Sequence, residues 1–298
     1  MSTRTPTPAT VDDAPSSDGL DGSSGVRVTR KPERLWSTPR VVATQLAILA
    51  TVLFAWEYVP KIDGLAEVSP VFDPFFVSSP SMIFSRLIDL AAGSDGQPLI
   101  WPYLRDTLLA TGVGVTVGIV LGAFFGLVLS NSRNGQRVTR PFITVLNATP
   151  RVALIPIFVI LAGPSLTASI LTAIITVFFL VFYNAFMGGS SIPASSIDNA
   201  VLLGATKGEV MRSVRLPYVL VWTFASLPNS ITFGLVAVVT AEVLTGRMGM
   251  GQLMYVSISS INSTLTFCVV VILAIVGVVL VTAADAIQRR VLHWWTEQ

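Results

Sequence analysis

Long apolar runs dominate the chain and predict helices that cross a membrane. Six of them reach the length of about 20 residues that a helix needs to span a bilayer. They cover residues 41–59, 107–129, 141–162, 166–187, 218–243 and 265–283. Because lipid offers the backbone no hydrogen-bond partners, each run is expected to form a helix. The pattern therefore predicts an all-α membrane protein with about six transmembrane helices.

The polar stretches divide the rest of the chain. Residues 1–40 are rich in Ser, Thr, Pro, Asp and Gly, and such a segment buries too little apolar surface to fold. We expect a disordered tail there and a transmembrane domain over 41–295. Within the first long loop, residues 78–92 carry apolar positions interleaved with Arg86 and Asp89, which predicts a short amphipathic helix at the outer surface.

Composition and charge agree with this pattern. Of the 298 residues, 52% are hydrophobic and 12% are charged, and mean hydropathy is +0.71, which argues against a soluble enzyme. With the N-terminus inside, 14 of the 19 Lys and Arg residues lie in inner segments and four in outer loops. This bias predicts a multi-pass protein of the cell membrane with both termini in the cytoplasm. A net charge of +2 gives no indication of nucleic-acid binding.

Two features of the spans concern packing. The second span carries Gly114, Gly118, Gly122 and Gly126 at intervals of four, on one helix face. Such a face lets a neighbouring backbone come close, either within the subunit or, alternatively, in a dimer. Pro228 lies inside the fifth span and is expected to kink it.

The inner loop at 188–217 carries two sequence signals for helix starts. Ser195 with Asp198 and Thr206 with Glu209 have the spacing of capping boxes, and Gly204 lies between the two predicted helices. Pro217 is expected to stop the second helix. A simple connection needs only a few residues, so this longer loop favours docking to a cytoplasmic partner. A surface loop packed only on itself is the alternative.

The same loop resembles a known motif. Asp198-Asn199-Ala200, three residues, Gly204, nine residues and Val214-Arg215-Leu216-Pro217 resemble the EAA loop of permease subunits of ABC importers. That pattern reads Glu-Ala-Ala, three residues, Gly, nine residues, Ile-x-Leu-Pro. The chain departs from it at positions 198, 199 and 214. By this resemblance, the following residues would contact an ATPase subunit: Asp198, Asn199, Ala200, Val201, Leu202, Leu203, Gly204, Val214, Leu216 and Pro217.

Other stretches resemble the sulfonate, taurine and nitrate branch of that family. They are Ser79-Pro80-Ser81, residues 149–156, Ala241-Glu242-Val243-Leu244 followed by Gly249-Met250-Gly251, and residues 288–294. The resemblance implies a type I importer fold and a small organic or inorganic anion, such as a sulfonate or nitrate, as substrate.

The resemblance also implies partners. Two permease copies, expected to be identical, would form one pathway in the lipid membrane, with a separate ATP-binding ABC subunit inside and a solute-binding protein outside. The chain has no Gly-rich phosphate-binding motif, so we expect ATP on the partner and no cofactor here. His293 is the only histidine. We therefore predict no catalytic residues and no metal site, and a non-enzymatic subunit.

Polar residues within the spans are candidates for the substrate pathway: Asn147, Thr149, Arg151, Asn229 and Glu242. A charge in the membrane usually faces a cavity or a partner. Arg151 either attracts an anionic substrate, forms a structural pair or lies nearer the cytoplasm than the middle of the third predicted span. Glu242 either gates the path, pairs with Arg247 or lies among headgroups. A secondary transporter or channel working alone is the rival function, and it has no use for an EAA-like loop.

Overall fold

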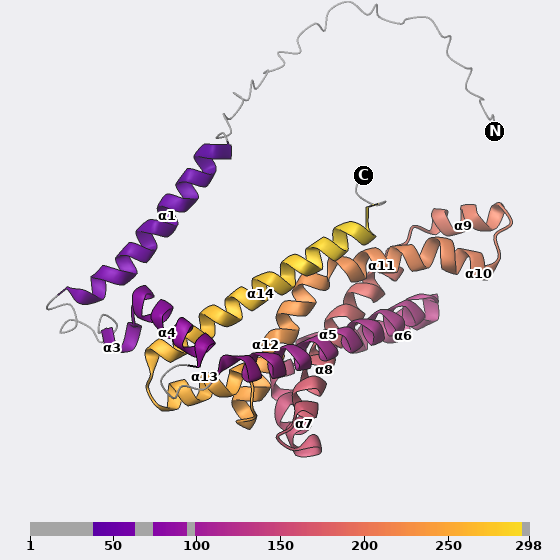
Figure 1. Ribbon diagram of the computed structural model, residues 1–298. Helices are drawn as coiled ribbons and strands as arrows, with labels where there is room; N and C mark the ends of the chain where they lie inside the picture. Colours follow the sequence, from indigo (N-terminus) through magenta and orange to yellow (C-terminus); the bar gives the residue numbers. More distant parts are fainter. Residues whose placement is uncertain (1–37, 63–73, 94–98, 294–298) are drawn as a thin grey trace, which may run out of the picture. The chain divides into compact units, whose positions relative to one another are not determined.

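The computed structural model describes residues 38–62, 74–93 and 99–293, and every regular element in these ranges is helical. The chain divides into two compact units, Met1–Leu49 and Ala50–Gln298, and the division falls within α1 (Thr38–Tyr58). The expected disordered tail at 1–40 lies almost entirely outside the described residues. Every described helix after α1 belongs to the second unit (Figure 1).

Five helical stretches of the described residues are long and apolar enough to cross a membrane. They are Pro39–Lys61, Ile100–Ser130, Leu166–Ser190, Leu227–Thr245 and Ser263–Val291. Five of the six predicted spans are therefore confirmed as helices of spanning length, although the fifth is shorter at its start. The all-α class is confirmed for the described part of the chain.

The glycine face of α5 (Ile100–Ser130) packs against α8 (Leu166–Ser190), and all four glycines are buried. An added Cβ on Gly118 would lie 2.8 Å from the Cβ of Val177, closer than side chains tolerate. Gly122 and Gly126 meet α8 equally closely. The close-approach face thus serves packing within the subunit, which was the first of the two sequence interpretations.

The third predicted span is not one helix, and that expectation was wrong. It consists of α6 (Arg133–Ala148), a 3-10 turn η3 (Arg151–Leu154) and α7 (Ile155–Ala162). The interruption falls at Thr149-Pro150, because a proline disfavours helical backbone in the residue before it. Thr149 accordingly has an extended backbone, with ψ 125°.

The fifth predicted span is interrupted near Pro228, as the sequence predicted. α11 (Leu216–Ala225) ends at Ser226, and α12 (Leu227–Thr245) begins immediately after it. Pro228 has no N–H to donate to the carbonyl of Phe224, so the helical hydrogen bonding lapses there. The Ser226 N–H is shared between the carbonyls of residues 222 and 223.

The remaining helices pack at the far end of α12. α13 (Met250–Ser259) and α14 (Ser263–Val291) follow α12, and α4 (Pro80–Ala92) packs on α14. The short helix α3 (Pro74–Val77) and the 3-10 turn η1 (Val59–Lys61) precede α4. In α4, Ile83 and Leu90 are buried in a core with Met250, Leu253, Leu265, Cys268 and Val269. Segment 78–92 therefore contains a helix, whose exposed side includes the apolar residues Met82, Phe84 and Ile88.

Candidate functional site

The first helix of the loop at 188–217 is α9 (Ala194–Leu202), and Pro193 stands at its N-cap without a side-chain hydrogen bond. The predicted cap at Ser195 was wrong. The helix begins one residue before Ser195, so that serine is already inside the first turn and does not cap it. Pro193 starts the helix through its backbone, since its carbonyl accepts from the N–H of Ser196 at 3.1 Å.

A glycine turn ends α9. Gly204 has φ +87°, a left-handed conformation that is costly for any residue with a Cβ. Its N–H donates to the carbonyl of Val201 at 2.9 Å, and the N–H of Ala205 donates to the carbonyl of Ala200 at 3.0 Å. These two bonds form a Schellman motif. The sequence requires glycine at 204 for this backbone reversal.

The second helix of the loop begins with the predicted capping box. Thr206 precedes α10 (Lys207–Val210), and its hydroxyl accepts from the N–H of Glu209. The Glu209 carboxylate in turn accepts from the backbone N–H of Thr206 at 2.7 Å and from its hydroxyl at 2.8 Å. These hydrogen bonds lower the pKa of Glu209 below its ordinary value.

Pro217 does not end the second helix, and that expectation was wrong. A π-helical segment, η4 (Met211–Arg215), joins α10 directly to α11. Its wider turn lets the N–H of Leu216 bond to the carbonyl of Met211, so Pro217 enters at a position where its missing N–H is tolerated. Figure 1 shows α9 and α10 folded back on each other beyond α11.

α9 presents apolar side chains that no described part of the chain covers. None of its residues is buried, and Leu202 and Leu203 are 84% and 90% exposed. Val201 beside them is also exposed, as are Asp198 and Asn199, whereas Ala200, Val214, Leu216 and Pro217 are half-buried. This geometry argues against a loop packed only on itself. Adjacent exposed leucines are typical of a surface that meets a partner.

The predicted pathway residues fall into separate places. Asn147, Thr149 and Arg151 surround the interruption between α6 and α7, with the Thr149 hydroxyl donating to the carbonyl of Val145 at 2.9 Å. The side-chain positions of Asn147 and Arg151 lie outside the described part of the structure. The break places polar and charged residues between α6 and α7, and discontinuous helices of transporters commonly bind solute at such breaks.

Asn229 and Glu242 both lie on α12 but do not meet. Thirteen residues of α-helix separate them by about 20 Å along the axis and turn them to different faces. Asn229 is exposed and Glu242 is fully buried. The structure therefore does not join the five predicted pathway residues into one site.

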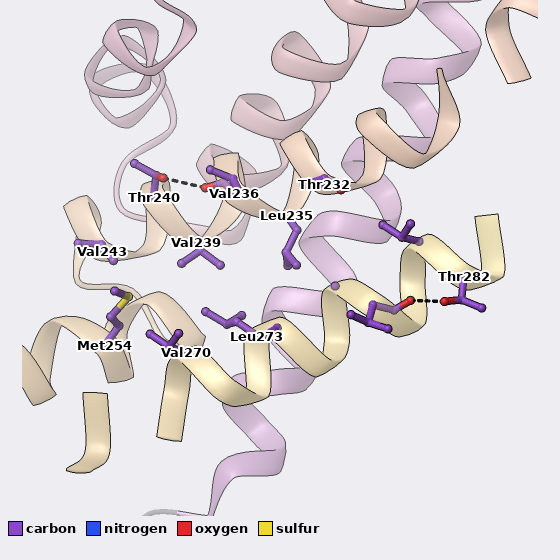
Figure 2. Close-up of a pocket in the computed structure, with 14 residues that line it drawn as sticks. Thr232, Leu235, Val236, Val239, Thr240, Val243, Met254, Val270, Leu273 and Thr282 are labelled. Carbon is purple, nitrogen blue, oxygen red and sulfur yellow. Dashed lines mark hydrogen bonds between the residues drawn. The ribbon is translucent and has the colours of Figure 1, made fainter. Parts of the chain in front are cut away.

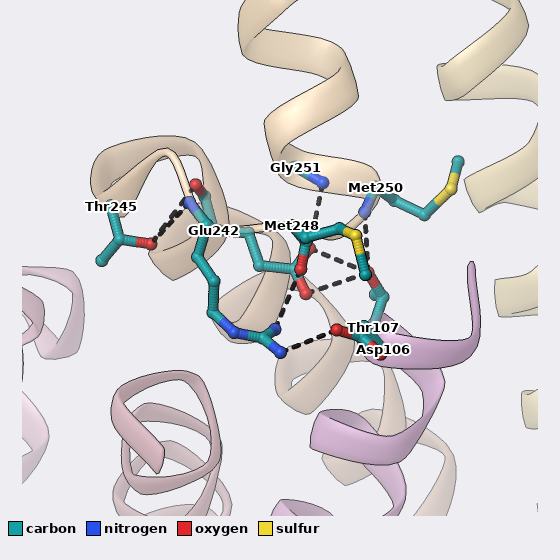
Figure 3. A network of polar contacts seen from close by, with 8 residues as sticks. Asp106, Thr107, Glu242, Thr245, Met248, Met250 and Gly251 are labelled. Carbon is teal, nitrogen blue, oxygen red and sulfur yellow. Dashed lines mark hydrogen bonds and ion pairs between the residues drawn. The ribbon is translucent and has the colours of Figure 1, made fainter. Parts of the chain in front are cut away.

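Glu242 is part of a hydrogen-bond network between three helices (Figure 3). Its carboxylate oxygens accept from the hydroxyl of Thr107 on α5, at 2.8 and 2.9 Å, and from the N–H of Gly251 on α13, at 3.0 Å. The Thr107 hydroxyl also accepts from the N–H of Met250 at 2.8 Å. A Cβ at Gly249 or Gly251 would overlap the Glu242 side chain. Glu242 thus fastens α12 to α5 and α13.

Arg247 pairs with Asp106, not with Glu242. Its guanidinium donates to the Asp106 carboxylate at 2.7 Å and to the carbonyl of Met248 at 2.9 Å. The expectations of an Arg247 pair or a headgroup position for Glu242 were therefore wrong, and its buried carboxylate does not line an open path. Sequence reasoning missed Asp106 and Thr107, whose only signal was a polar pair at the head of a long apolar run.

A groove of about 740 Å³ lies between α12, α13 and α14 (Figure 2). Its lining is almost entirely aliphatic. The hydroxyls of Thr232, Thr240 and Thr282 donate to carbonyls of their own helices, at 2.7 to 3.0 Å. The hydrogens of these hydroxyls are already engaged, so the groove is poorly suited to a polar solute, and it contains none of the predicted pathway residues.

Comparison with known proteins gives a consistent result. Residues 114–295 match the family described as binding-protein-dependent transport system inner membrane component. The riboflavin transport system permease protein of Chloroflexus aurantiacus is 25% identical, covering 90% of this chain and 97% of the relative. The taurine transport system permease protein of Escherichia coli is 24% identical, covering 90% and 96%. The nitrate import permease protein of Synechocystis is 23% identical, covering 86% and 91%.

Solved structures agree on the fold. An inward-facing methionine ABC transporter, MetNI, superposes with a TM-score of 0.55 and 24% identity, over 65% of this chain and 98% of that one. An amino acid ABC transporter superposes with a TM-score of 0.54 and 18% identity, over 70% and 96%. The type I importer fold is thereby confirmed, as is the resemblance to permeases named for taurine, nitrate and aliphatic sulfonates.

Proposed function

The chain belongs to the family of binding-protein-dependent transport system inner membrane components, and on that premise we propose that it forms the substrate pathway of an ATP-driven importer. It would couple that pathway to a separate ATPase subunit. The observation that carries the proposal is the exposed apolar surface of α9, Val201-Leu202-Leu203, on a loop with EAA-like spacing.

The loop is built to transmit a contact. The Schellman turn at Gly204 and the capping box at Thr206 fix α9 against α10, so a partner that seats the three apolar side chains also holds α10. Burying two leucines on a partner is worth about 1.5–3 kcal/mol for each side chain. ATP-driven movement of that partner would then be passed to the membrane helices.

The other partners follow from the same proposal. A second, identical copy would complete the pathway, and a solute-binding protein would deliver substrate from outside. The chain would lie in the cell membrane with both termini in the cytoplasm, as the distribution of Lys and Arg favours. ATP would bind only to the ATPase subunit, and this chain would carry no cofactor.

We propose a small anion as the substrate, attracted by Arg151 at the interruption of the third crossing. Asn147, Thr149 and, further along the path, Asn229 would supply polar contacts. A cation at a broken helix inside a membrane is costly unless it meets a counter-charge, and a passing anion supplies one. Relatives are named for taurine and nitrate and also for riboflavin, and uptake of each by the reconstituted importer distinguishes among them.

Copurification with the ATPase subunit tests the coupling proposal. Gly204→Asp should insert normally but lose ATPase association and uptake, because a charge enters an apolar contact and the backbone there has φ +87°. Leu202→Ala or Leu203→Ala should have the same effect more mildly. Gly208→Ala is the matched control within the loop, since a Cβ there has open space and ordinary φ, and Asp13→Ala is the control in the tail.

Wild-type association and uptake in Gly204→Asp would show that this loop is not the docking site. Solute uptake by the purified chain alone, without any ATPase subunit, would instead support the rival secondary transporter or channel.

A further inference from the structure

Helix α6 has three distinct faces around its axis. At about 100° per residue, Arg133, Arg137 and Arg140 fall within about 60° of one another and form a basic face. Val138, Phe142 and Val145 fall within another 60° and form an apolar face, centred about 140° away. All six side chains are exposed.

The third face attaches α6 to the rest of the unit. Thr139 and Ile143 are buried, and Ile143 packs on Phe182 and Phe186 of α8. Near the start of the helix, the Gln136 side-chain amide donates to the carbonyl of Ser130 at 2.7 Å. Within the residues that the structure describes, only one of the three faces therefore has a partner.

The basic face has no acidic partner in the part of the chain that the structure describes. The ion pairs found there join Lys61 to Glu57 and Arg247 to Asp106. α6 itself contains no acidic residue. Three cations on one exposed face favour an anionic partner from outside the chain.

The two exposed faces lie at different heights along the helix axis. Gln136 ties the start of α6 to the last residue of α5, and Phe186 lies one turn before α8 ends at Ser190. The basic face is therefore level with the ends of two spanning helices. The apolar face is centred five residues later, about 7 Å further along the helix and away from those helix ends.

We propose that the basic face of α6 binds the headgroups of anionic phospholipids while the apolar face contacts their acyl chains. Charged headgroups and acyl chains lie side by side at a membrane interface, and arginines at this depth extend toward the headgroups. The acidic surface of a soluble subunit would satisfy the arginines but not the apolar face. That the leaflet is the cytoplasmic one rests on the proposed orientation.

Lipid selectivity of the full-length chain tests this proposal. The chain is reconstituted in symmetric vesicles of phosphatidylcholine with a minor fraction of phosphatidylglycerol, and spin-labelled forms of both lipids report which one borders the protein. An arginine beside an anionic surface contributes about 1 kcal/mol, or about fivefold in binding. Arg133→Gln/Arg137→Gln/Arg140→Gln should therefore lower the preference for phosphatidylglycerol at least about fivefold, and high salt should do the same to the wild type.

A matched control removes the same charge elsewhere. Arg212, Arg289 and Arg290 are also exposed, and the triple change of these residues to Gln should keep most of the wild-type preference. Equal loss in both triple variants would overturn the proposal, because it would show that net charge alone attracts the lipid. An unchanged preference in the α6 variant would overturn it as well, and loss of ATPase copurification alongside would assign the basic face to that subunit.

The vesicle measurement uses no ATP, ATPase subunit or solute-binding protein, and both leaflets have the same composition. Its outcome is therefore independent of whether the proposed transport function or orientation is correct.

Discussion

The contact between α5 and α8 allows one perturbation to be worked out from geometry. Gly126 is buried on α5, and an added Cβ would lie 2.5 Å from the Cβ of Ala185, 3.0 Å from the N of Phe186 and 3.1 Å from the O of Phe182. Gly112 lies on the same helix but is exposed, and a Cβ there meets nothing within 4 Å. The two glycines thus form a matched pair.

The two substitutions to alanine are expected to change the free energy of unfolding in opposite directions. Alanine stabilises a helix interior by about 0.5–1 kcal/mol relative to glycine, which is the whole expected effect of Gly112→Ala. Gly126→Ala gains the same amount but must push α8 away, and overpacking of this kind costs about 1–3 kcal/mol. Since backbone atoms lie behind the clashing Cβ, we expect a cost near the upper end and net destabilisation of about 2 kcal/mol.

The contact between position 126 and Ala185 also predicts that a second substitution restores stability. Ala185→Gly removes the nearest atom, so Gly126→Ala/Ala185→Gly should be more stable than the sum of the single effects by about 1–2 kcal/mol. Free energies of unfolding are measured by titrating sodium dodecyl sulfate into the protein in detergent micelles and following tryptophan fluorescence. If Gly126→Ala is as stable as Gly112→Ala, or if the double variant shows no coupling, the close approach of α5 and α8 is refuted.

Three further predictions concern single side chains. Thr107→Val should destabilise the protein by about 1–3 kcal/mol in the same titration, because buried Glu242 loses a donor, and Thr107→Ser should restore most of it. Arg151→Ala should leave copurification intact but lower anion uptake; a complex that falls apart would make Arg151 structural. Folding lowers the pKa of Glu209, so its hydrogen bonds to Thr206 stabilise α10 fully at pH values above the ordinary carboxyl pKa. This stabilisation is lost as the pH falls through the pKa of Glu209 in the folded protein. Amide exchange in α10, corrected for intrinsic rates, should rise at low pH in the wild type and be insensitive to pH in Glu209→Gln.

The spans and the glycine face were predictable because both depend on local periodicity. A long apolar run has few alternatives to a membrane helix, and four glycines at helical spacing mark a face without reference to any other part of the chain. The capping box at Thr206 and the turn at Gly204 were accessible for the same reason.

The errors arose where a local rule competed with its surroundings. Ser195 has capping-box spacing, but Pro193 starts α9 earlier. A proline often ends a helix, but the π-helical segment before Pro217 accommodates its ring. The hydrophobicity of 141–162 is high enough for a span, yet Pro150 divides it into two helices.

The hydrogen-bond network around Glu242 could not be predicted from the sequence, because its residues are far apart in the chain. Thr107 and Glu242 are separated by 135 positions, and no periodicity links a residue at the head of α5 to one at the end of α12. The motif Ala241-Glu242 with Gly249 and Gly251 marked one half of the contact, while the other half required the folded chain.

The passage of α10 through η4 into α11 has a mechanical consequence. Helical hydrogen bonding continues from Lys207 to Ala225, so the loop and the first part of the next crossing form one stiff rod about 28 Å long at 1.5 Å per residue. A torque applied at the loop end would be carried along this rod toward Pro228, which has no N–H for the carbonyl of Phe224 and so interrupts the helical bonding. Because α11 packs on α8, movement of the rod would also act on α8, while the far end of α12 is held by the hydrogen bonds of Glu242.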